Sequence, residues 1–400
     1  MRWFIHGSEQ PRHSAHFESI LRHLDQQGDD EYIFIRPKKA LGLYTLQPKS
    51  WMLHRLRDIF WDWFSWTPNG FDASDWEWHW KDRGEQPKVI DGPEEHWRYG
   101  CSATKGNLPW RPEVILGVSP HEGSMKYHLI PWARRNGIPI VSIDHGLPTQ
   151  VNPMAVYRST MMGCDAWACW GEFACEVNAA IGAPRERMVA TGSPTIDHLQ
   201  DVALAADYRG RLGVEGDQRM ILLMTTHRDP IKSWADSVFR NVVERYGSDE
   251  RYRIVVKPHP MELVGGGLID FGERAIIIEE QTELHQLMLA ADVIISPATS
   301  VIAPAMAFQK PFIDLLVPDA PGFEGVVDTS LINELLKDAV FHPDQLEAVV
   351  SGVIEVDAQA CELAFIQLAH SRDGRNGERV ASLCRHMAEG GEPWDWADDI

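Results

Sequence analysis

The feature that most constrains the fold is an alternation of short apolar runs with amphipathic stretches along nearly the whole chain. In the first half the strand-like runs are residues 3–6, 32–35, 114–118, 140–143, 166–169 and 188–191. A stretch with apolar residues at helical spacing, residues 14–27, separates the first two runs. Strands that alternate with helices are typical of βαβ units, whose strands form a largely parallel sheet. The sequence therefore predicts an α/β fold.

The pattern restarts after a polar stretch at residues 201–216 that contains three glycines. Further strand-like runs follow at residues 220–224, 253–256, 275–278, 293–295 and 312–315, and residues 344–390 have a helical pattern. A chain of 400 residues is long enough for two domains. We predict two Rossmann-like domains, residues 1–200 and residues 201–400 with a helical tail, and expect the polar stretch at 201–216 to connect them.

Composition excludes several classes of protein. The net charge of −20 argues against a protein that coats nucleic acid or anionic lipid, because like charges repel. The six cysteines form no disulfide-like spacing, which favours a reducing compartment. The amino end is too polar for a signal peptide, and no run approaches the roughly 18 apolar residues of a membrane span. We therefore expect a soluble, cytoplasmic protein.

A tryptophan-rich interval, residues 51–110 within an insertion at about 45–110, interrupts the rhythm. One interpretation is an insertion that packs its aromatic rings on the first domain. The other is a platform for an acceptor or a lipid interface, because tryptophan offers broad amphipathic surfaces. The sequence does not choose between them.

Ligands of doubly wound folds bind beyond the carboxyl ends of the strands, so polar residues there are candidate site residues. In the first half these are Asp144-His145-Gly146 and the turn at residues 191–197, which contains Ser193. His145 is able to take a proton near neutral pH, and the alternative is a hydrogen-bonded structural histidine. The turn either binds a phosphate or caps the following helix.

Four more strand-end or helix-start motifs occur in the second half. Thr225-Thr226-His227-Arg228 combines hydroxyl, imidazole and guanidinium groups that suit an anion. Lys257-Pro258-His259-Pro260 presents its cationic side chains on a rigid loop. Thr299 and Ser300 precede an apolar helix, where they either cap it or donate to a diphosphate. The cluster at residues 373–379 includes Arg375, and alone it indicates no more than a solvated charged surface.

Taken in order, these segments resemble the GT-B glycosyltransferases, most closely the CDP-glycerol glycerophosphotransferases and the capsule or surface-polysaccharide transferases. The resemblance covers about residues 138–383. It rests on His145-Gly146, Trp170-Gly171, the turn at 191–197, Lys257 to Pro260, Thr299-Ser300 with Lys310-Pro311, and residues 373–379.

A second GT-B group is also similar, namely the non-hydrolysing UDP-N-acetylglucosamine 2-epimerases, through Thr226-His227-Arg228 and residues 191–197. The chain lacks their glycine-threonine-arginine-proline-glutamate signature and has residues 7–12, GSEQPR, instead, which argues against epimerisation. Residues 301–305 also lack the acid that many GT-B proteins carry there. A non-catalytic scaffold that binds a nucleotide sugar is therefore a third interpretation.

The resemblance implies a metal-independent transferase with a nucleotide cleft between an acceptor-side first domain and a donor-side second domain. It would move a glycosyl or polyol-phosphate group from a CDP- or UDP-linked donor to a hydroxyl of a surface glycan or its lipid-linked precursor. No cofactor is expected, and peripheral association with the inner face of the membrane stays open. We expect His145 to be the base. The expected donor-binding residues are Ser193, Thr226, His227, Arg228, Lys257, His259, Thr299, Ser300 and Arg375.

Overall fold

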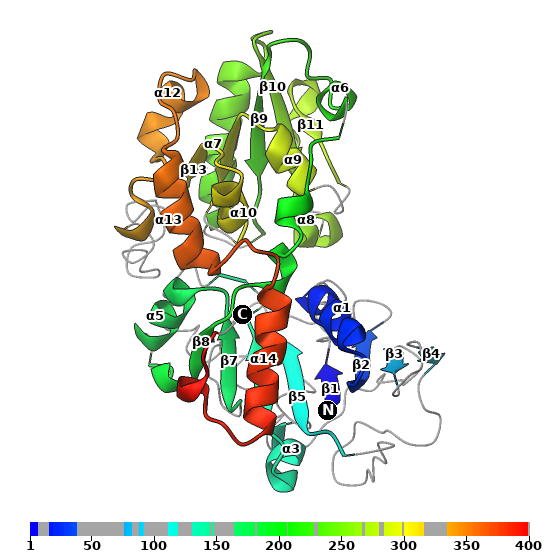
Figure 1. Ribbon diagram of the computed structural model, residues 1–400. Helices are drawn as coiled ribbons and strands as arrows, with labels where there is room; N and C mark the ends of the chain where they lie inside the picture. The colour runs from blue at the N-terminus through cyan, green and yellow to red at the C-terminus, as the bar shows by residue number, and fades with distance from the viewer. Residues whose placement is uncertain are drawn as a thin grey trace, which may run out of the picture. The chain divides into compact units, whose positions relative to one another are not determined.

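The computed structural model divides the chain into two compact units, each with its own β-sheet (Figure 1). Unit 1 contains Met1–His145, Val156–Asp197 and Arg375–Ile400, and unit 2 contains Gly146–Ala155 and His198–Gly374. The division differs from the one expected at residues 201–216, because residues 375–400 return to unit 1. The residues that the structure describes are 1–6, 16–37, 76–81, 88–91, 111–118, 130–144, 146–147, 164–180, 182–205, 207–227, 231–265, 269–279, 284–297, 300–315 and 334–398.

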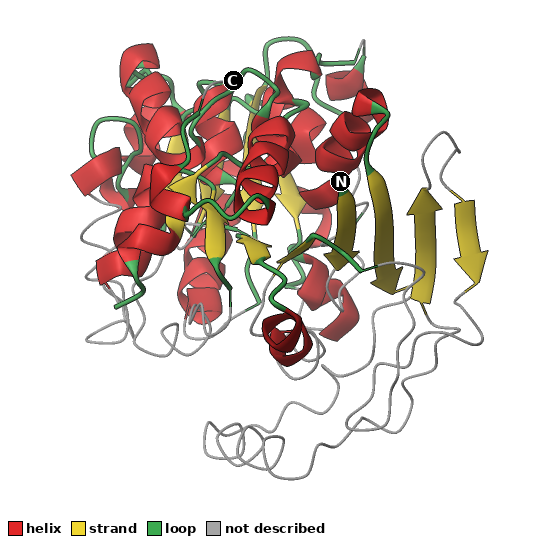
Figure 2. Ribbon diagram, turned by 60° about the horizontal axis from the view of Figure 1, so that its bottom comes forward, coloured by secondary structure: helices red, strands yellow, loops and turns green. Residues whose placement is uncertain are grey.

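The sheet of unit 1 has the strand order β4-β3-β2-β1-β5-β6-β7-β8. Its strands are β1 (Arg2–His6), β2 (Glu31–Pro37), β3 (Trp76–Lys81), β4 (Lys88–Asp91), β5 (Val114–Val118), β6 (Ile140–Ile143), β7 (Ala166–Cys169) and β8 (Met188–Ala190). Neighbours among β1, β2 and β5 to β8 are parallel. Strands β3 and β4 extend one edge in antiparallel fashion, as Figure 2 shows. The sheet therefore has a doubly wound centre and an added antiparallel edge.

Helices cover both faces of this sheet. They are α1 (Glu18–Gln27), α3 (Ile130–Asn136), α5 (Glu172–Ala180) and α14 (Asn376–Ala388). Alternate residues of β7 belong to two separate apolar clusters, Ala166 and Ala168 to one with α1 and α14, and Trp167 and Cys169 to one with α5. Because strand side chains alternate between faces, these clusters lie on opposite sides. Helix α14 packs beside α1, although some 350 residues separate them in the sequence (Figure 1).

The sheet of unit 2 is parallel, in the order β11-β10-β9-β12-β13. Its strands are β9 (Arg219–Met224), β10 (Tyr252–Lys257), β11 (Ile276–Ile277), β12 (Val293–Ser296) and β13 (Phe312–Asp314). Its helices are α6 (Tyr208–Arg211), α7 (Ile231–Tyr246), α8 (Pro260–Gly265), α9 (Leu284–Ala290), α10 (Ile302–Ala307), α12 (Leu346–Val350) and α13 (Ala358–Ala369). One face of β9, β10 and β12 packs against α7 in the main apolar core, through Ile221, Ile254 and Phe239 among others.

Short 3-10 helices complete the described part of both units. In unit 1 they are η5 (Arg185–Arg187), η6 (Pro194–Ile196) and η10 (Pro393–Asp395). In unit 2 they are η7 (Leu199–Asp201), η8 (Gly272–Arg274) and η9 (Pro343–Gln345). The residues 201–216 that we expected to connect the domains lie within unit 2 and include α6.

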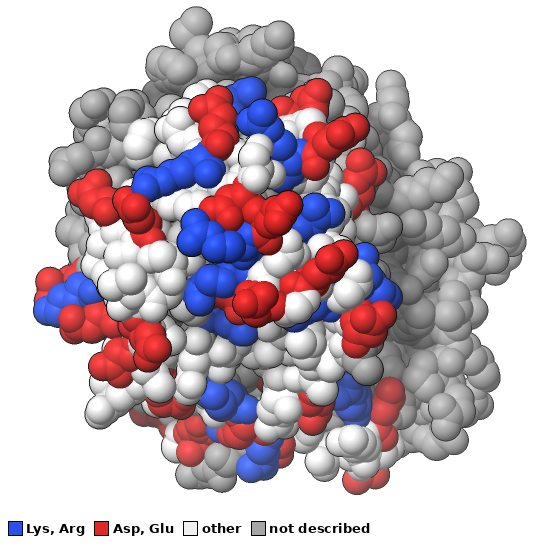
Figure 3. All heavy atoms as spheres, turned by 90° about the horizontal axis from the view of Figure 1, so that it is seen from above, with Lys and Arg blue, Asp and Glu red and all other residues white. Residues whose placement is uncertain are grey.

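The prediction of an α/β fold with two Rossmann-like halves is confirmed. Every predicted strand overlaps a strand of the structure, and the helical tail is present as α12, α13 and α14. Strands β3 and β4 were not predicted. They lie in the tryptophan-rich insertion, whose other residues are outside the described part of the chain. The charged face of the molecule in Figure 3 mixes Lys and Arg with Asp and Glu, with no large area of one sign among its coloured residues.

Candidate functional site

The parallel strands of unit 2 bring three sequence motifs to one edge of the sheet. Strands β10, β9 and β12 are neighbours, and their carboxyl ends therefore lie at the same edge. The residues that end or follow these strands are Thr225, Thr226 and His227 after β9, Lys257 and His259 at and after β10, and Ser296 and Ser300 at and after β12. We call this set the carboxyl edge of unit 2.

A buried carboxylate, that of Glu262, connects the loops that follow β9 and β10. Its Oε2 accepts the backbone N–H of His259 at 3.1 Å and the hydroxyl hydrogen of Thr225. The Thr225 Oγ1 also accepts the His259 N–H, at 2.9 Å. Glu262 lies in the first turn of α8 and reaches back to the residue before the helix, as in a capping box. The two loops are thus fixed to one another by a single side chain.

Lys232 of α7 balances the charge of Glu262. Its Nζ lies 2.6 Å from Glu262 Oε1 and 3.0 Å from Asp236 Oδ2. Burial disfavours the charged form of Lys232, but the hydrogen bonds to the two carboxylates outweigh burial and raise its pKa. For Asp236 burial is the stronger effect, and it raises the pKa of that carboxyl. Lys232 therefore carries its proton at neutral pH and compensates a carboxylate whose residue is only 3% exposed.

The imidazoles of His227 and His259 lie face to face on this edge. Their ring centroids are 4.3 Å apart and their planes are inclined by 28°. A neutral imidazole has one N–H donor and takes a second proton near neutral pH. Two protonated rings at this distance repel each other, and a bound anion relieves that repulsion. The pair, with the adjacent hydroxyl of Thr226, therefore has the chemistry to bind a phosphate oxygen.

Lys257 reaches the same edge but turns toward the neighbouring strand. Its residue is 4% exposed, and its Nζ donates to the carbonyl oxygen of Ile278 at 3.3 Å. Ile278 directly follows β11. This contact supports the edge of the sheet, and the expected role of Lys257 in phosphate binding stays a prediction.

Ser300 contacts the segment that follows β6 in the sequence. Its Oγ accepts the backbone N–H of Leu147 at 2.9 Å. A Cβ on Gly146 would lie 2.5 Å from this oxygen, which explains why glycine occupies the position. Residues 146 and 147 belong to unit 2, although β6 belongs to unit 1. Ser300 therefore fixes the backbone immediately after the predicted base.

Three of the predicted site residues are not described. His145, Arg228 and Thr299 lie outside the described part of the chain. Their predicted roles as the base and as donor-binding residues therefore remain predictions.

Two other predicted residues of unit 1, Ser193 and Arg375, belong to a junction around Asp197. The Asp197 carboxylate accepts the backbone N–H groups of Asn376 and Gly377, at 2.9 and 2.8 Å, and the Ser19 hydroxyl at 2.5 Å. Burial raises its pKa. The amino end of α14 therefore already has an anion, supplied from a residue 179 positions earlier.

Neither predicted residue extends into an open site at this junction. Ser193 is fully buried, and its Oγ lies 2.7 Å from Thr195 Oγ1. The Arg375 guanidinium pairs with Glu378, its Nε lying 2.8 Å from the carboxylate. Each of these two side chains thus has a polar partner within unit 1.

Asp144 is a buried carboxyl at the carboxyl end of β6. It is 6% exposed, and burial raises its pKa to about 7, although the nearby Cys169 and Trp167 side chains act in the opposite direction. Its Oδ2 is buried without a hydrogen-bond partner among the described residues. Asp144 faces the α5 side of the sheet. Residues 142 and 144 point to the same face of β6, and their neighbours on β7, Trp167 and Cys169, pack against α5.

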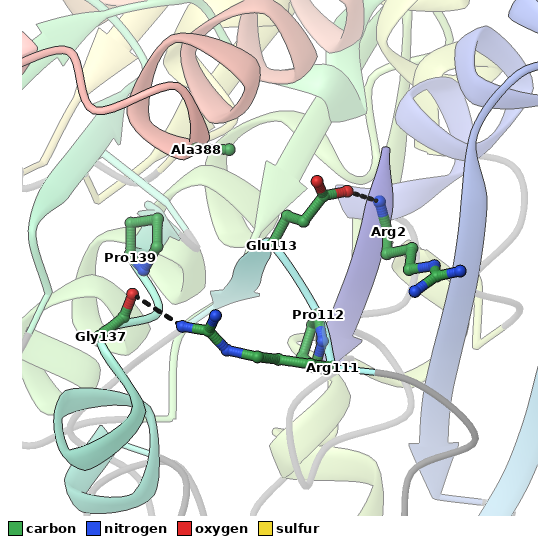
Figure 4. Close-up of a pocket in the computed structure, with 7 residues that line it drawn as sticks. All are labelled: Arg2, Arg111, Pro112, Glu113, Gly137, Pro139 and Ala388. Atoms are coloured by element: carbon green, nitrogen blue, oxygen red, sulfur yellow. Dashed lines mark hydrogen bonds between the residues drawn. The ribbon is translucent and has the colours of Figure 1, made fainter.

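A pocket of about 520 Å³ lies at the opposite, amino edge of the unit 1 sheet (Figure 4). Its lining residues are Arg2, Arg111, Pro112, Glu113, Gly137, Pro139 and Ala388. The Glu113 carboxylate accepts the backbone N–H of Arg2 at 2.7 Å, and Arg111 donates to the carbonyl oxygens of Asn136 and Gly137. None of the predicted site residues lines this pocket.

The described residues contain no group of three or more His, Cys, Asp or Glu side chains arranged to bind a metal ion. No described helix is long and apolar enough to cross a bilayer.

The carboxyl edge of unit 2 lies within a segment of the chain that matches a known family. Residues 176–321 match the model of the CDP-Glycerol:Poly(glycerophosphate) glycerophosphotransferases. This glycerophosphotransferase segment contains Thr226, His227, Lys257, His259 and Ser300, and it excludes His145 and Arg375. The resemblance predicted from the sequence is confirmed over these residues. No curated protein matches the chain.

Solved structures resemble the chain over nearly its whole length. The S. aureus MnaA–UDP co-structure has a TM-score of 0.58 at 12% identity and covers 99% of this chain and 100% of its own. The Methanocaldococcus jannaschii UDP-GlcNAc 2-epimerase, in complex with UDP-GlcNAc and UDP, has a TM-score of 0.54 at 15% identity and covers 98% and 100%. The wall teichoic acid polymerase TagF has a TM-score of 0.48 at 14% identity and covers 70% and 73%. Similarity at such low identity concerns the fold alone, and the first two structures establish the GT-B fold of the chain.

Sequence reasoning missed the residue with the most connections at this edge, Glu262. A signal for it exists, because His259-Pro260-Met261-Glu262 has proline at the first helical position and glutamate at the third. The partners Lys232 and Asp236 have no such signal. They are four residues apart on an amphipathic helix, which is the ordinary spacing of a surface ion pair.

Proposed function

We propose that this chain is a transferase that moves a glycosyl or polyol-phosphate group from a CDP- or UDP-linked donor to a hydroxyl acceptor in surface-polysaccharide biosynthesis. The observation that carries this proposal is the overlap of two findings. The glycerophosphotransferase segment contains the carboxyl edge of unit 2. On that edge, two stacked imidazoles lie beside hydroxyl groups, where a parallel sheet binds its ligands.

In this proposal the donor phosphates bind His227, His259, Thr226 and Ser300, with Lys257, Arg228 and Thr299 adding charge and hydrogen bonds. The Ser300 oxygen accepts from Leu147, and its own hydrogen is directed to a phosphate oxygen. The proposal places the predicted residues Ser193 and Arg375 outside the donor site, since their side chains contact Thr195 and Glu378 within unit 1.

The reaction transfers a group between two oxygens. The acceptor oxygen attacks the carbon or phosphorus atom of the donor that carries the transferred group, and His145 takes the acceptor proton. The bond to the nucleotide phosphate breaks, and its negative charge is stabilised by the cationic and N–H groups of the carboxyl edge. The chemistry requires no metal ion in this scheme.

The acceptor in this proposal is a growing surface glycan, such as a capsule, or its lipid-linked precursor. The reaction takes place in the cytoplasm, at the inner face of the membrane that carries such a precursor. The polymeric acceptor in the description of the matched family supports this assignment.

A thermal-shift panel with CDP, CMP, UDP and GDP tests the proposal on the wild type, on His259→Ala and on His342→Ala. A nucleotide at 100 times its Kd stabilises a folded protein by about 2.7 kcal/mol. We expect a cytidine nucleotide to raise the Tm of the wild type and of His342→Ala but not that of His259→Ala. His342 is a suitable control because it is an exposed histidine of unit 2 that caps η9.

Turnover then separates the three interpretations. A transferase consumes its donor only when an acceptor is present. Isomerisation of UDP-N-acetylglucosamine without an acceptor would establish the epimerase instead. Nucleotide binding without either reaction would establish a scaffold, and the absence of any nucleotide-induced shift would overturn the site assignment.

A further inference from the structure

Glu262 holds together the part of the carboxyl edge that carries the stacked histidines. We propose that Glu262 is a positioning residue whose carboxylate fixes the backbone of His259 against the loop after β9 and favours protonation of the His259 imidazole. The inference rests on the proposed function in one respect, namely that His259 binds a donor phosphate. Its central test, the titration of His259, does not require a nucleotide.

The first argument is geometric. Glu262 accepts the N–H of His259 itself, and the same N–H is shared with Thr225 at the end of β9. The other carboxylate oxygen binds Lys232, which comes from α7. One buried side chain therefore connects two loops and a helix at the point where His259 leaves the backbone. Without Glu262, the His259 N–H keeps only its bond to Thr225 among these contacts, and the connection of the two loops to α7 is lost.

The second argument is electrostatic. Among the described residues, the titratable groups of this part of the edge are His227 after β9, Lys257 of β10, Glu262 of α8, and Lys232 and Asp236 of α7. A nearby carboxylate favours the protonated imidazole, and a nearby ammonium disfavours it. Replacing Glu262 by glutamine keeps the shape of the side chain but leaves Lys232 less compensated. The pKa of His259 should then fall.

A matched control lies at the other end of the same sheet. The Oδ2 of Asp292 accepts the backbone N–H of Met220 at 2.7 Å and both terminal nitrogens of Arg209 at 3.1 Å. Like Glu262, Asp292 connects a strand to a basic side chain of another element. Met220 lies near the start of β9, whereas Thr225 follows its end. Asp292→Asn therefore removes a carboxylate with a similar set of partners, although a more exposed one, without touching the carboxyl edge.

The experiment uses the full chain with 15N-labelled histidine. The imidazole signals are followed from pH 5 to pH 9 in the wild type, Glu262→Gln and Asp292→Asn, and the signal of His259 is identified by its loss in His259→Ala. We expect the pKa of His259 to fall by about 1 in Glu262→Gln and to stay unchanged in Asp292→Asn. If Glu262→Gln does not fold, Thr225→Val tests the geometric argument, because it keeps the carboxylate but removes the bridging hydroxyl. Thr225→Ser, which retains a hydroxyl, should then give the wild-type His259 signal.

Calorimetric titration with CDP and UDP on the same variants supplies the second readout. A displaced binding group weakens affinity by up to roughly 100-fold, so we expect a Kd at least about tenfold higher in Glu262→Gln at pH 7, and a wild-type Kd in Asp292→Asn.

An unchanged titration of His259 in Glu262→Gln, or an equal change in Asp292→Asn, would overturn the inference. A wild type that binds neither nucleotide, with His259 still responding to Glu262→Gln as expected, would overturn the proposed function and leave the positioning role standing.

Discussion

In unit 1, the amino end of α14 is bound by a carboxylate of the chain itself. In unit 2, the polar side chains that follow the strands include two imidazoles that face each other. Asp197 accepts both N–H groups offered by Asn376 and Gly377. His227 and His259 instead combine two cation-forming rings at 4.3 Å, and their one nearby buried carboxylate binds the backbone of His259 and Lys232.

The difference separates two motifs that look alike in the sequence. Small polar residues after a strand either satisfy a helix terminus within the protein or are presented to a ligand. The turn at residues 191–197 takes the first course, and the proposed function assigns the second to Thr226, His227 and His259. Each of the following predictions tests one side of this comparison, in order of decreasing effect.

The largest effect concerns Asp144, a buried carboxyl of unit 1 whose pKa of about 7 lies above its value in an unfolded chain. The folded protein therefore prefers neutral Asp144, and ionisation costs stability as pH rises from about 4 to about 7. By pH 8 this cost reaches roughly 4 kcal/mol. Asp144→Asn should abolish this component of the pH dependence. Urea unfolding at pH 5 and pH 8 measures it, and a wild type and variant with parallel pH profiles would contradict the prediction.

The next effect tests whether the amino end of α14 is a structural junction. Asp197→Ala leaves the N–H groups of Asn376 and Gly377 without their acceptor, so it should lower the local stability of α14 by about 3 kcal/mol. Hydrogen exchange of the amides at residues 380–388 measures this change. Asp201→Ala, in the exposed end of η7, is the control. If Asp197→Ala abolished nucleotide binding while α14 exchanged as in the wild type, this end of the helix would be a ligand site after all.

A third prediction concerns the close approach of Gly146 and Ser300. A Cβ at position 146 would lie 2.5 Å from Ser300 Oγ but 3.7 Å from its Cβ. Gly146→Ala should therefore cost about 1–2 kcal/mol in the wild type and much less in a Ser300→Ala background. Thermal unfolding of the two single variants and the double variant measures the coupling. Strictly additive effects would show that the two residues do not touch.

The smallest effect is that of Arg375→Ala. Its guanidinium forms a half-exposed pair with Glu378 one turn along α14, and such pairs contribute about 0.5 kcal/mol. We expect a small loss of Tm and an unchanged Kd for CDP. A clear loss of CDP affinity would return Arg375 to the donor site predicted from the sequence.

The fold could be predicted because most strands have a local sequence pattern of their own. Runs such as residues 220–224 and 293–295 are continuously apolar, as strands buried on both faces must be. Strands β3 and β4 lacked this signal, since Trp76–Lys81 alternates tryptophan with polar residues and Lys88–Asp91 has only two apolar residues between two charged ones. An edge pair with such a pattern is hard to distinguish from an aromatic insertion.

The site was harder to predict because its decisive contacts join distant positions. Lys232 and Glu262 are 30 residues apart, and Asp197 and Asn376 are 179 apart. Motif spacing predicted that the loops after β9, β10 and β12 carry polar side chains, and the structure places His259 and Ser300 at the same edge of the sheet. It did not indicate that the Ser193 hydroxyl lies against Thr195 within its own turn.

The return of α14 to unit 1 has a consequence for the order in which the protein is made. The apolar cluster between α1 and the sheet includes Val380, Leu383 and Cys384, so the amino-terminal unit cannot close its core until these residues have left the ribosome. Apart from residues 146–155, unit 2 is one continuous stretch that ends before them. The part of the chain that is synthesised first is therefore the part that finishes folding last. During translation one apolar face of its sheet is exposed, and exposed apolar surface of this kind is what chaperones bind.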